Sequence, residues 1–262
     1  MPKRHLSESR VLITGASGGL GAALAIELAR TKARLVLNAR REDKLRAVAA
    51  QVEEAGGQAV VALGDVTDKS VRRESLQLAQ QHFGGLDVLV NNAGVSAWGA
   101  FDQAGEERLR RIMEVNFFAM AELTRESARL LAKGREPLIV NIASILGHRG
   151  IPLQVEYCAS KFAVRGFSEA IRPELTRLGI DVLLVSPGTT ETEFFEHLLD
   201  KATEMPWRSH RGVPAARVAR QIVHAMRSGR NEIIPGGRGK LLVWLNRFCP
   251  RAVDAWMARY FR

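Results

Sequence analysis

A glycine-rich turn between a short apolar strand and an alanine-rich helix is the feature that most constrains the fold of this chain. Residues 10–14 form an apolar, β-branched run typical of a buried strand. The run leads into Gly15-Ala16-Ser17-Gly18-Gly19-Leu20-Gly21, and an alanine- and leucine-rich segment follows from Ala22 to about Arg30. Glycines let the backbone turn tightly and approach a pyrophosphate, whose charge a helix N-terminus stabilises. A strand, a glycine turn and a helix in this order predict a dinucleotide-binding site.

The end of the second predicted strand indicates which dinucleotide binds. A site that holds the ribose hydroxyls of NAD places an acid about twenty residues after the glycine turn. Here Ala39 occupies that position and Arg40 and Arg41 follow it. A guanidinium suits a phosphate, so this end of the site predicts NADP(H) in preference to NAD(H). The alternative is that the arginines merely precede a helix whose first turn carries Glu42 and Asp43.

A tyrosine and a lysine later in the chain have the spacing of an acid–base pair. Tyr157 and Lys161 are four residues apart, which on a helix places a phenol and an ammonium on one face. A free phenol has a pKa near ~10, and a neighbouring cation lowers it toward the range useful for catalysis. Ser144 offers a hydroxyl that can hold a substrate oxygen. The pattern predicts proton transfer at an alcohol or carbonyl oxygen, although such a pair alone is also typical of a helix surface.

These motifs together resemble the short-chain dehydrogenase/reductase family in its single-domain form, over residues from about 10 to 235. Residues 14–21 resemble the family's cofactor loop, and residues 91–94, Asn-Asn-Ala-Gly, resemble the turn beneath the cofactor. The resemblance implies hydride transfer between C4 of a nicotinamide and a substrate carbon. The residues at the family's catalytic positions are Asn116, Ser144, Tyr157 and Lys161. The residues at its cofactor-binding positions are Gly15, Ser17, Gly18, Gly19, Leu20, Gly21, Arg40, Arg41, Asp65, Val66, Asn92, Ala93, Gly94, Tyr157, Lys161, Pro187, Gly188, Thr189 and Thr192.

The resemblance also implies a role for each catalytic residue. Tyr157 would be the general acid in reduction and the base in oxidation, while Ser144 would hydrogen-bond the substrate oxygen. Lys161 would lower the phenol pKa and bind the nicotinamide ribose, and Asn116 would bind a water that links Lys161 to solvent. The alternatives are that Ser144 caps a turn and that Asn116 bends its helix.

The implied activity is the NADP(H)-dependent interconversion of a carbonyl and an alcohol on a small molecule. Two other functions compete with it. An epimerase or dehydratase on the same cofactor platform would normally carry a larger C-terminal domain. A non-catalytic NADP-binding sensor or scaffold would commonly lack the tyrosine or the lysine.

Apolar runs along the chain predict the remaining architecture. They lie at 11–13, 35–37, 60–63, 86–90, 138–142 and 182–185, and are typical of buried parallel strands. Helical segments separate them, which favours right-handed crossovers. We therefore expect an α/β fold: a Rossmann-like, doubly wound parallel sheet with helices on both faces, in three αβα layers. A single domain should span residues 1–262.

Apolar residues after Thr192 indicate either a lid over a lipophilic pocket or the core face of a short helix. They are Phe194, Phe195, His197, Leu198, Leu199, Met205, Pro206 and Trp207. His148 and Arg149 are expected near the pocket mouth, where Arg149 would be a solvated loop residue or, as the alternative, would contact an acidic group of the substrate. The resemblance implies a homodimer or homotetramer, for which Phe117, Phe118 and Phe167 could form an interface or an ordinary core.

Basic residues and tryptophans are concentrated near the end of the chain. The net charge is +10, and residues 230–262 contain seven Lys or Arg against Glu232 and Asp254. We expect residues 238–262 to be a basic amphipathic extension in which Pro250 separates two helices. The extension could pack on its own core or a second subunit, bind an anionic membrane surface, or bind nucleic acid. No recognisable nucleic-acid module accompanies the charge, so we expect no nucleic-acid partner.

Cysteine usage and hydropathy indicate where the protein resides. The two cysteines lack metal-ligand spacing and a plausible disulfide partner, and no metal site is expected. Cys158 is expected to be a buried thiol. No apolar stretch reaches the ~18 residues of a spanning helix, and the first residues do not resemble a secretion signal. We expect a cytoplasmic protein, and peripheral contact at the inner face of a membrane through the C-terminal helix is one of the alternatives for the extension.

Overall fold

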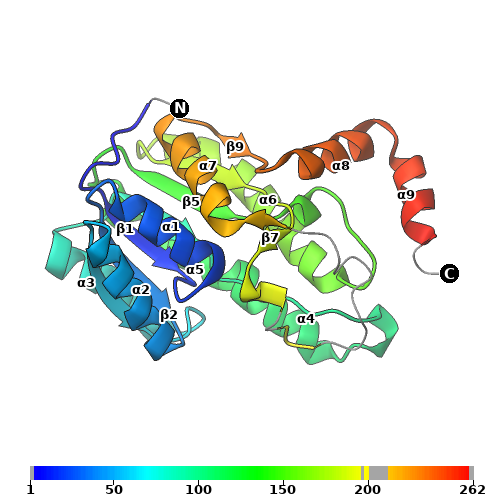
Figure 1. Cartoon of the computed structure of the whole chain (residues 1–262), viewed down its shortest axis with the longest axis horizontal. Coiled ribbons are helices and arrows are strands. Elements are labelled where there is room, and N and C mark those ends of the chain that lie inside the picture. The colour runs from blue at the N-terminus through cyan, green and yellow to red at the C-terminus, as the bar shows by residue number, and fades with distance from the viewer. Residues whose placement is uncertain (1–2, 196–197, 201–211, 260–262) are drawn as a thin grey trace.

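The computed structural model describes residues 3–195, 198–200 and 212–259. Its main sheet contains seven parallel strands in the order β3-β2-β1-β4-β5-β6-β9 (Figure 1). These strands are β1 (Arg10–Thr14), β2 (Arg34–Ala39), β3 (Gln58–Leu63), β4 (Val88–Asn91), β5 (Leu138–Ile142), β6 (Asp181–Val185) and β9 (Glu232–Ile233). A separate pair joins β7 (Thr190–Glu191) to β8 (Val213–Pro214). The predicted doubly wound α/β fold is confirmed.

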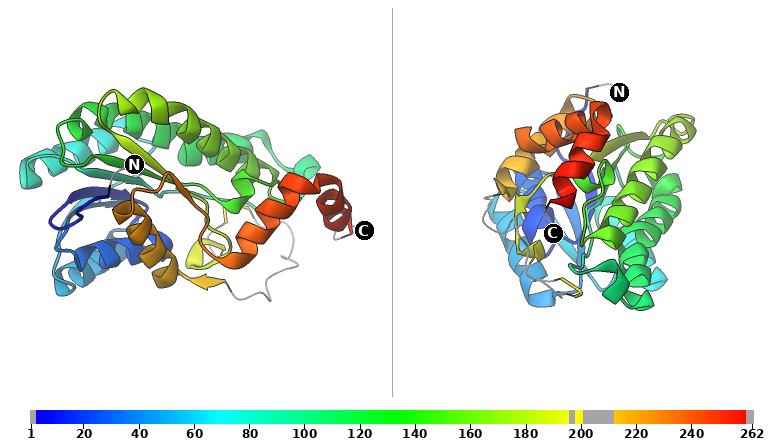
Figure 2. Two further views of the ribbon diagram at one scale, coloured as in Figure 1. Left: turned by 90° about the horizontal axis from the view of Figure 1, so that it is seen from above. Right: turned by 90° about the vertical axis from the view of Figure 1, so that its right-hand side faces the viewer.

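Helices cover both faces of the sheet, as the left view of Figure 2 shows. Alternating side chains of each strand pack against different layers, because successive strand residues point to opposite faces. In β1, Val11 and Ile13 join one apolar cluster and Leu12 joins the other. The first cluster includes residues of α1 (Gly19–Ala29), α2 (Glu42–Glu54) and α7 (Ala215–Arg227), and the second those of α3 (Lys69–Phe83), α5 (Ala119–Leu131) and α6 (Val155–Thr176).

Shorter elements complete the chain. Next to the pocket, α4 (Glu106–Met113), the π-helical turn η2 (Glu114–Phe118) and α5 follow one another without a break. The 3-10 turns are η1 (Phe101–Gln103), η3 (Ile145–Gly147) and η4 (Glu193–Phe195). Helices α8 (Gly237–Phe248) and α9 (Pro250–Ala258) lie at the end of the molecule opposite α2 and α3 (Figure 1). Two helices that meet at Pro250 are what the sequence predicts.

The first helix begins earlier than the sequence predicts, at Gly19 instead of Ala22. The reason is that Gly15, with φ +65°, makes the sharp turn after β1, so the later glycines already belong to the helix N-terminus. Strand β1 lies between β2 and β4, which places the reversal of strand order next to this turn. In open α/β sheets, ligands bind beyond the carboxyl ends of the strands at this point.

Candidate active site

One large cavity opens at the carboxyl ends of strands β1 to β6, and its volume is about 1550 Å³. A typical ligand cleft measures roughly 300–1000 Å³, so this cavity has room for a dinucleotide and a second molecule. Every predicted cofactor-binding residue except Gly21 lines it. The structure thus brings together residues from loops that are up to 177 positions apart in the sequence.

The glycine turn is shaped by contacts that leave no room for side chains. A Cβ on Gly21 would lie 2.3 Å from the carbonyl oxygen of Gly15, and a Cβ on Gly15 would lie 2.9 Å from Cα of Ala93. Gly19 has φ +55° and would meet the side chain of Thr192 at 3.2 Å. The backbone therefore forms a close cradle at the N-terminus of α1, an arrangement that suits a pyrophosphate.

Thr14, which the sequence interpretation did not assign to the site, joins the two loops of this cradle. Its Oγ1 accepts hydrogen bonds from the backbone N–H groups of Asn92 and Ala93, both at 3.0 Å. In return, Nδ2 of Asn92 donates to the carbonyl oxygens of Thr14 and Gly15, at 2.9 and 3.2 Å. The loops after β1 and β4 therefore hold each other in place, and Asn92 acts first as a positioning residue.

Arg40 stands at the outer end of the cavity, where its side chain is 60% exposed and its Nη1 is 3.7 Å from Oδ2 of Asp65. Asp65 also accepts a hydrogen bond from Nη2 of Arg111 at 2.6 Å. Burial raises the pKa of Asp65, but hydrogen bonds from Thr67 and Arg111 outweigh it and the net pKa is lowered. The carboxylate is thus charged at neutral pH and holds Arg40 near the cavity.

A second cation, Arg41, lies beside the glycine turn. Nη2 of Arg41 is 3.5 Å from Oγ of Ser17, and its Nη1 is 3.3 Å from a carboxylate oxygen of Glu193. Lys44 donates to the same oxygen at 2.8 Å. Since these side chains are largely exposed, the pairs add little stability. These contacts do, however, gather cations and a hydroxyl group around one end of the cavity.

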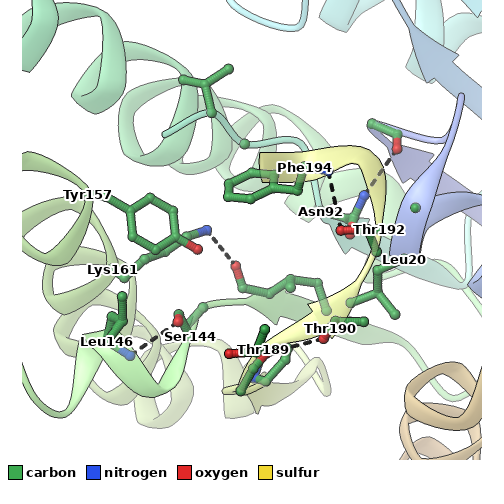
Figure 3. A pocket seen from close by; sticks show the side chains of 18 of the residues that line it. Leu20, Asn92, Ser144, Leu146, Tyr157, Lys161, Thr189, Thr190, Thr192 and Phe194 are labelled. Carbon is green, nitrogen blue, oxygen red and sulfur yellow. Dashed lines mark hydrogen bonds between the residues drawn. The ribbon is translucent and has the colours of Figure 1, made fainter. Parts of the chain in front are cut away.

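Ser144 and Tyr157 meet on the opposite wall, deep in the cavity (Figure 3). Ser144 follows the buried strand β5 and its Oγ accepts a hydrogen bond from the N–H of Leu146 at 3.1 Å, so it does cap η3. Its hydroxyl also hydrogen-bonds the phenol of Tyr157. Lys161 lies one turn further along α6, with Nζ 5.6 Å from the centroid of the Tyr157 ring and 2.9 Å from the carbonyl oxygen of Ile142.

Burial decides the protonation of this pair. It raises the pKa of Tyr157 well above that of a free phenol, and the hydrogen bond from Ser144 offsets only part of the rise. The pKa of Tyr157 is therefore not lowered toward the range useful for catalysis, as the sequence predicted, because the loss of solvent around the phenolate dominates. Burial also lowers the pKa of Lys161 to about 8. At neutral pH the phenol keeps its proton and the ammonium keeps most of its charge.

Asn116 lies in the π-helical turn η2 and is fully buried. Its Oδ1 accepts from the N–H of Val95 at 2.8 Å, while its Nδ2 donates to the carbonyl oxygen of Val95 and to Oγ of Ser160, both at 2.9 Å. Ser160 in turn donates to the carbonyl oxygen of Tyr157 at 2.7 Å. Asn116 therefore connects the loop after β4 to the first turns of α6. It also lies where the helix is distorted, which agrees with the alternative prediction that Asn116 bends its helix.

A buried ion pair fixes the start of α6. Arg108 of α4 donates to Oε1 of Glu156 through Nε and Nη2, at 2.9 and 2.6 Å, and both side chains are at most 6% exposed. Arg108 also reaches Asp200 at 3.2 Å. Because a buried charge that loses its partner is costly, this pair strongly specifies the position of the residue before Tyr157.

The inner part of the cavity is lined mainly by apolar side chains that sequence reasoning only partly identified. Phe194 packs on Tyr157 with ring centroids 5.8 Å apart, and Trp98 is 1% exposed. The backbone N–H of Trp98 donates to the carbonyl oxygen of Asp200. This hydrogen bond joins the segment after η4 to this wall. His197, Met205, Pro206 and Trp207 lie outside the described residues. The other apolar lining residues are Val95, Ile145, Leu146, Ile151, Leu242, Trp256 and Met257.

The C-terminal helices pack on this part of the cavity. Leu242 of α8 and Met257 of α9 line it, and a Cβ on Gly239 would lie 2.9 Å from Cγ2 of Ile145. Arg149 Nη1 donates to Asn246 Oδ1 at 3.1 Å and its Nη2 donates to Asp254 at 2.5 Å. The inner face of the extension therefore packs on the chain's own pocket.

Two expectations for the loop after Ser144 were wrong. Arg149 is not a solvated loop residue, because its guanidinium is held by the C-terminal helices and is 17% exposed. His148 does not line the cavity; its Nε2 lies 3.0 Å from Oγ of Ser186 and 3.4 Å from Glu232. Burial, with a contribution from Arg165, lowers the pKa of His148 to about 4. Cys158 is buried, as predicted.

Among residues 3–195, 198–200 and 212–259, no cluster of three His, Cys, Asp or Glu could hold a metal ion. Within the same ranges, none of the helices combines the length and the apolar character needed to cross a bilayer.

Comparisons with known proteins agree with the geometry. The chain is 30% identical to an uncharacterised oxidoreductase, YxnA, of Bacillus subtilis over 98% of its length and 73% of the relative's. It is 31% identical to the ketoacyl reductase HetN of a Nostoc species, over 95% of this chain and 88% of that protein.

Two solved short-chain dehydrogenases have the same fold. One, from Burkholderia phymatum in complex with NAD, superposes with a TM-score of 0.86 over 93% of this chain and 94% of that chain, at 23% identity. The other, from Burkholderia cenocepacia in complex with NADP, has a TM-score of 0.78 over 88% of this chain and 97% of that chain, at 28% identity. Residues 9–203 match the sequence profile described as short chain dehydrogenase. With the profile covering most of its length, this chain belongs to the short-chain dehydrogenase family of oxidoreductases.

Proposed function

We propose that this oxidoreductase uses NADP(H) to interconvert a carbonyl and a primary or secondary alcohol on a lipophilic substrate, with Tyr157 as the general acid and base. The observation that carries the proposal is the placement of Tyr157, Ser144 and Lys161 on the inner wall of a cavity that also contains the glycine cradle. The residues fit a dinucleotide, since the cradle excludes side chains where a pyrophosphate needs the backbone. The bound cofactor would supply or accept the hydride at the substrate carbon.

The protein groups then handle the proton. In reduction, the Tyr157 phenol donates its proton to the carbonyl oxygen as the carbon gains the electron pair of the hydride, which yields the alcohol and a phenolate. The N–H of Leu146 takes one acceptor position of Ser144, and the serine O–H, directed at the Tyr157 phenol in this structure, would turn to the substrate oxygen and steady it. The ammonium of Lys161 faces the phenolate and stabilises it. Oxidation runs these steps in reverse. The proton route to solvent through Asn116 remains part of this proposal.

The raised pKa of Tyr157 suits the acid role that this residue has in reduction. A phenol that holds its proton at neutral pH is ready to act as an acid, whereas oxidation must first remove that proton. The preference for NADP(H) fits this direction. It is supported by Arg40, Arg41 and Ser17 around the outer end of the cavity and by the apolar Ala39 where an acid would bind the ribose hydroxyls.

The apolar inner wall supports a lipophilic substrate. Trp98, Phe194 and Met257 present rings and a thioether to the space beside Tyr157, and such surfaces gain free energy by covering apolar groups. A substrate with one carbonyl and an apolar body would therefore place its polar oxygen at Ser144 and Tyr157.

We also propose a cytoplasmic homodimer or homotetramer that assembles through the helices carrying Asn116 and Tyr157. Phe117 and Phe167 are partly buried and pack edge to face, with ring centroids 5.9 Å apart, against an apolar cluster. Phe118 and Phe162 are 50% and 45% exposed and would supply an interface. Light scattering of Phe118→Ser and Phe162→Ser variants tests this assembly.

The proposed reaction is tested by an NADPH-oxidation screen over aldehydes, ketosteroids, 3-keto lipids and quinones, followed by Tyr157→Phe. The variant keeps the ring and removes the transferable proton, so kcat should fall by about 10²–10⁴-fold. NADPH affinity, measured by fluorescence titration, should change little. Normal turnover by Tyr157→Phe would refute the mechanism, and a wild type that binds NADPH but turns over none of these carbonyls would favour a sensor.

A further inference from the structure

We infer that the outer face of α8 and α9 binds an anionic lipid surface and that the apolar substrate enters the pocket from that surface. This second clause rests on the proposed carbonyl chemistry, whereas the docking surface itself does not. The inference starts from the two opposite faces of one helix, α8.

The inner face of α8 is already in contact with the pocket. Gly239, Leu242 and Asn246 are spaced i, i+3 and i+7, so they lie on one side of the helix. Gly239 abuts Ile145, Leu242 lines the cavity, and Asn246 donates to the carbonyl oxygen of His148 at 3.3 Å. This side of α8 needs no further partner.

The outer face of α8 carries the apolar side chains that a soluble helix would normally bury. Leu241, Trp244, Leu245 and Phe248 are spaced i, i+3, i+4 and i+7, and they are 57%, 58%, 38% and 62% exposed. The rings of Trp244 and Phe248 pack together with centroids 5.0 Å apart. Single exposed apolar residues are common on protein surfaces, but a continuous row of four is not. Such a stripe marks an interaction surface.

Charge identifies the occupant of this face. Residues 237–259 contain five Lys or Arg and one acid, Asp254, which is already paired with Arg149. Lys240 and Arg247 flank the apolar stripe on one side of α8, at positions adjacent to Trp244 on the helix surface, and both are exposed. Cations beside a tryptophan-bearing apolar stripe suit the headgroup region of an anionic bilayer, where apolar groups enter the lipid and cations meet its charge.

Trp256 connects this face to the substrate. Its side chain, on α9, is 47% exposed and also lines the cavity. A molecule dissolved in the lipid could therefore pass along Trp256 to Tyr157 without crossing bulk water. The chemical class that this route serves is a membrane-soluble carbonyl compound whose apolar body exceeds its polar part.

The surface is tested by co-sedimentation of the full chain with vesicles made of equal parts phosphatidylcholine and phosphatidylglycerol. Wild-type protein should pellet, and the Trp244→Ser/Phe248→Ser variant should bind more weakly by on the order of tenfold or more. Lys240→Glu/Arg247→Glu should lose binding to these vesicles in the same way, and about 1 M NaCl should weaken wild-type binding. The control, Phe101→Ser/Leu178→Ser, removes exposed apolar groups elsewhere, at 63% and 40% exposure, and should pellet like wild type.

The inference fails if wild-type protein stays in the supernatant, or if all variants pellet equally. It also fails if light scattering shows that Trp244→Ser/Phe248→Ser dissociates an oligomer, because a second copy would then cover this face. Turnover separates the two proposals. The variant should reduce a short, water-soluble carbonyl normally and a vesicle-embedded one several-fold more slowly. Vesicle binding without any carbonyl turnover would leave the surface established and the proposed reaction refuted.

Discussion

The two halves of the cavity are built in different ways. The cofactor half is formed by backbone: glycines whose surroundings leave no room for a Cβ, N–H groups that donate to Thr14, and carbonyl oxygens that accept from the Asn92 amide. The substrate half is formed by side chains from segments far apart, including Trp98, Phe194 and Trp256. A backbone cradle accepts few substitutions and binds one kind of ligand. A wall of side chains can change its shape by substitution without disturbing the cradle, which is how one scaffold can serve different substrates.

The largest effect should come from adding a methyl group to the cradle. Gly21→Ala places a Cβ 2.3 Å from the carbonyl oxygen of Gly15, so the loop must move, at a cost of about 3 kcal/mol of unfolding free energy. NADPH binding should weaken with it. Thermal unfolding and fluorescence titration measure the two effects.

The matched control is Gly166→Ala in α6, where the residue is exposed and a Cβ meets nothing within 4 Å. This change should stabilise the helix by about 0.5–1 kcal/mol. Equal behaviour of the two variants would show that the cradle tolerates side chains, and the contrast between the two halves would then be wrong.

The next effect concerns cofactor choice. We expect the unmodified protein to bind NADPH more tightly than NADH. Arg40→Asp should weaken NADPH binding by about 1.5–3 kcal/mol, because a charge-assisted contact to the 2′-phosphate is lost, and should leave NADH binding nearly unchanged. Arg40→Gln separates loss of the cation from the new repulsion beside Asp65. Arg46→Gln, which removes an exposed pair with Glu42 away from the cavity, is the control. Equal NADPH and NADH affinities in the unmodified protein would contradict the assignment.

The next, smaller effect is on the pH dependence of the free energy of unfolding. It arises from His148, which lies between the substrate half and the sheet. The pKa of His148 is lowered to about 4 by burial, with Arg165 adding to the shift and Glu169 opposing it, whereas the unfolded chain has a value near ~6.5. Below about pH 6.5 the His148 imidazole binds a proton in the unfolded state but not in the native state. Stability should therefore fall as pH drops from about 6.5 to 4, by about 2 kcal/mol.

Chemical denaturation across this pH range measures the slope. His148→Gln should flatten it, since the group that binds the proton is gone, and His82→Gln, which removes an exposed histidine on α3, should not. An unchanged slope in His148→Gln would show that other groups carry the acid sensitivity.

The smallest effect should be confined to the substrate half. Arg149→Met removes the contacts that hold α8 and α9 on the loop after Ser144, so KM for a lipophilic carbonyl should rise about fivefold while NADPH affinity stays constant. Arg73→Met, an exposed arginine on α3, is the control. A parallel loss of NADPH affinity would mean that the two halves are mechanically coupled.

The difference between the halves also explains how much the sequence could predict. Six of the strands and the cofactor loops were located because buried parallel strands and glycine turns leave local patterns. Strand β9 was missed because two residues, Glu232 and Ile233, form no pattern. Arg149 was misjudged because its partners lie about a hundred positions downstream, and no local rule brings them together.

The protonation of Tyr157 required the structure for a related reason. Sequence spacing reveals Lys161 one turn away, and therefore a cation, but it does not reveal how much protein surrounds the phenol. Desolvation is a property of the assembled fold, and here it outweighs the hydrogen bond from Ser144 and raises the pKa.

The π-helical turn that carries Asn116 constrains how many residues connect α4 to α5, as well as which residues they are. Arg108, Ile112, Asn116 and Met120 are each four residues apart and all are buried. In an uninterrupted α-helix such a row would drift by about 40° at every step, and the wide turn absorbs part of that drift. Deleting any one of residues 114–118 other than Asn116 would turn α4 by about 100° relative to α5 and carry Arg108 away from Glu156. A deletion of one residue here should therefore do more damage than most substitutions, even though no catalytic group is removed.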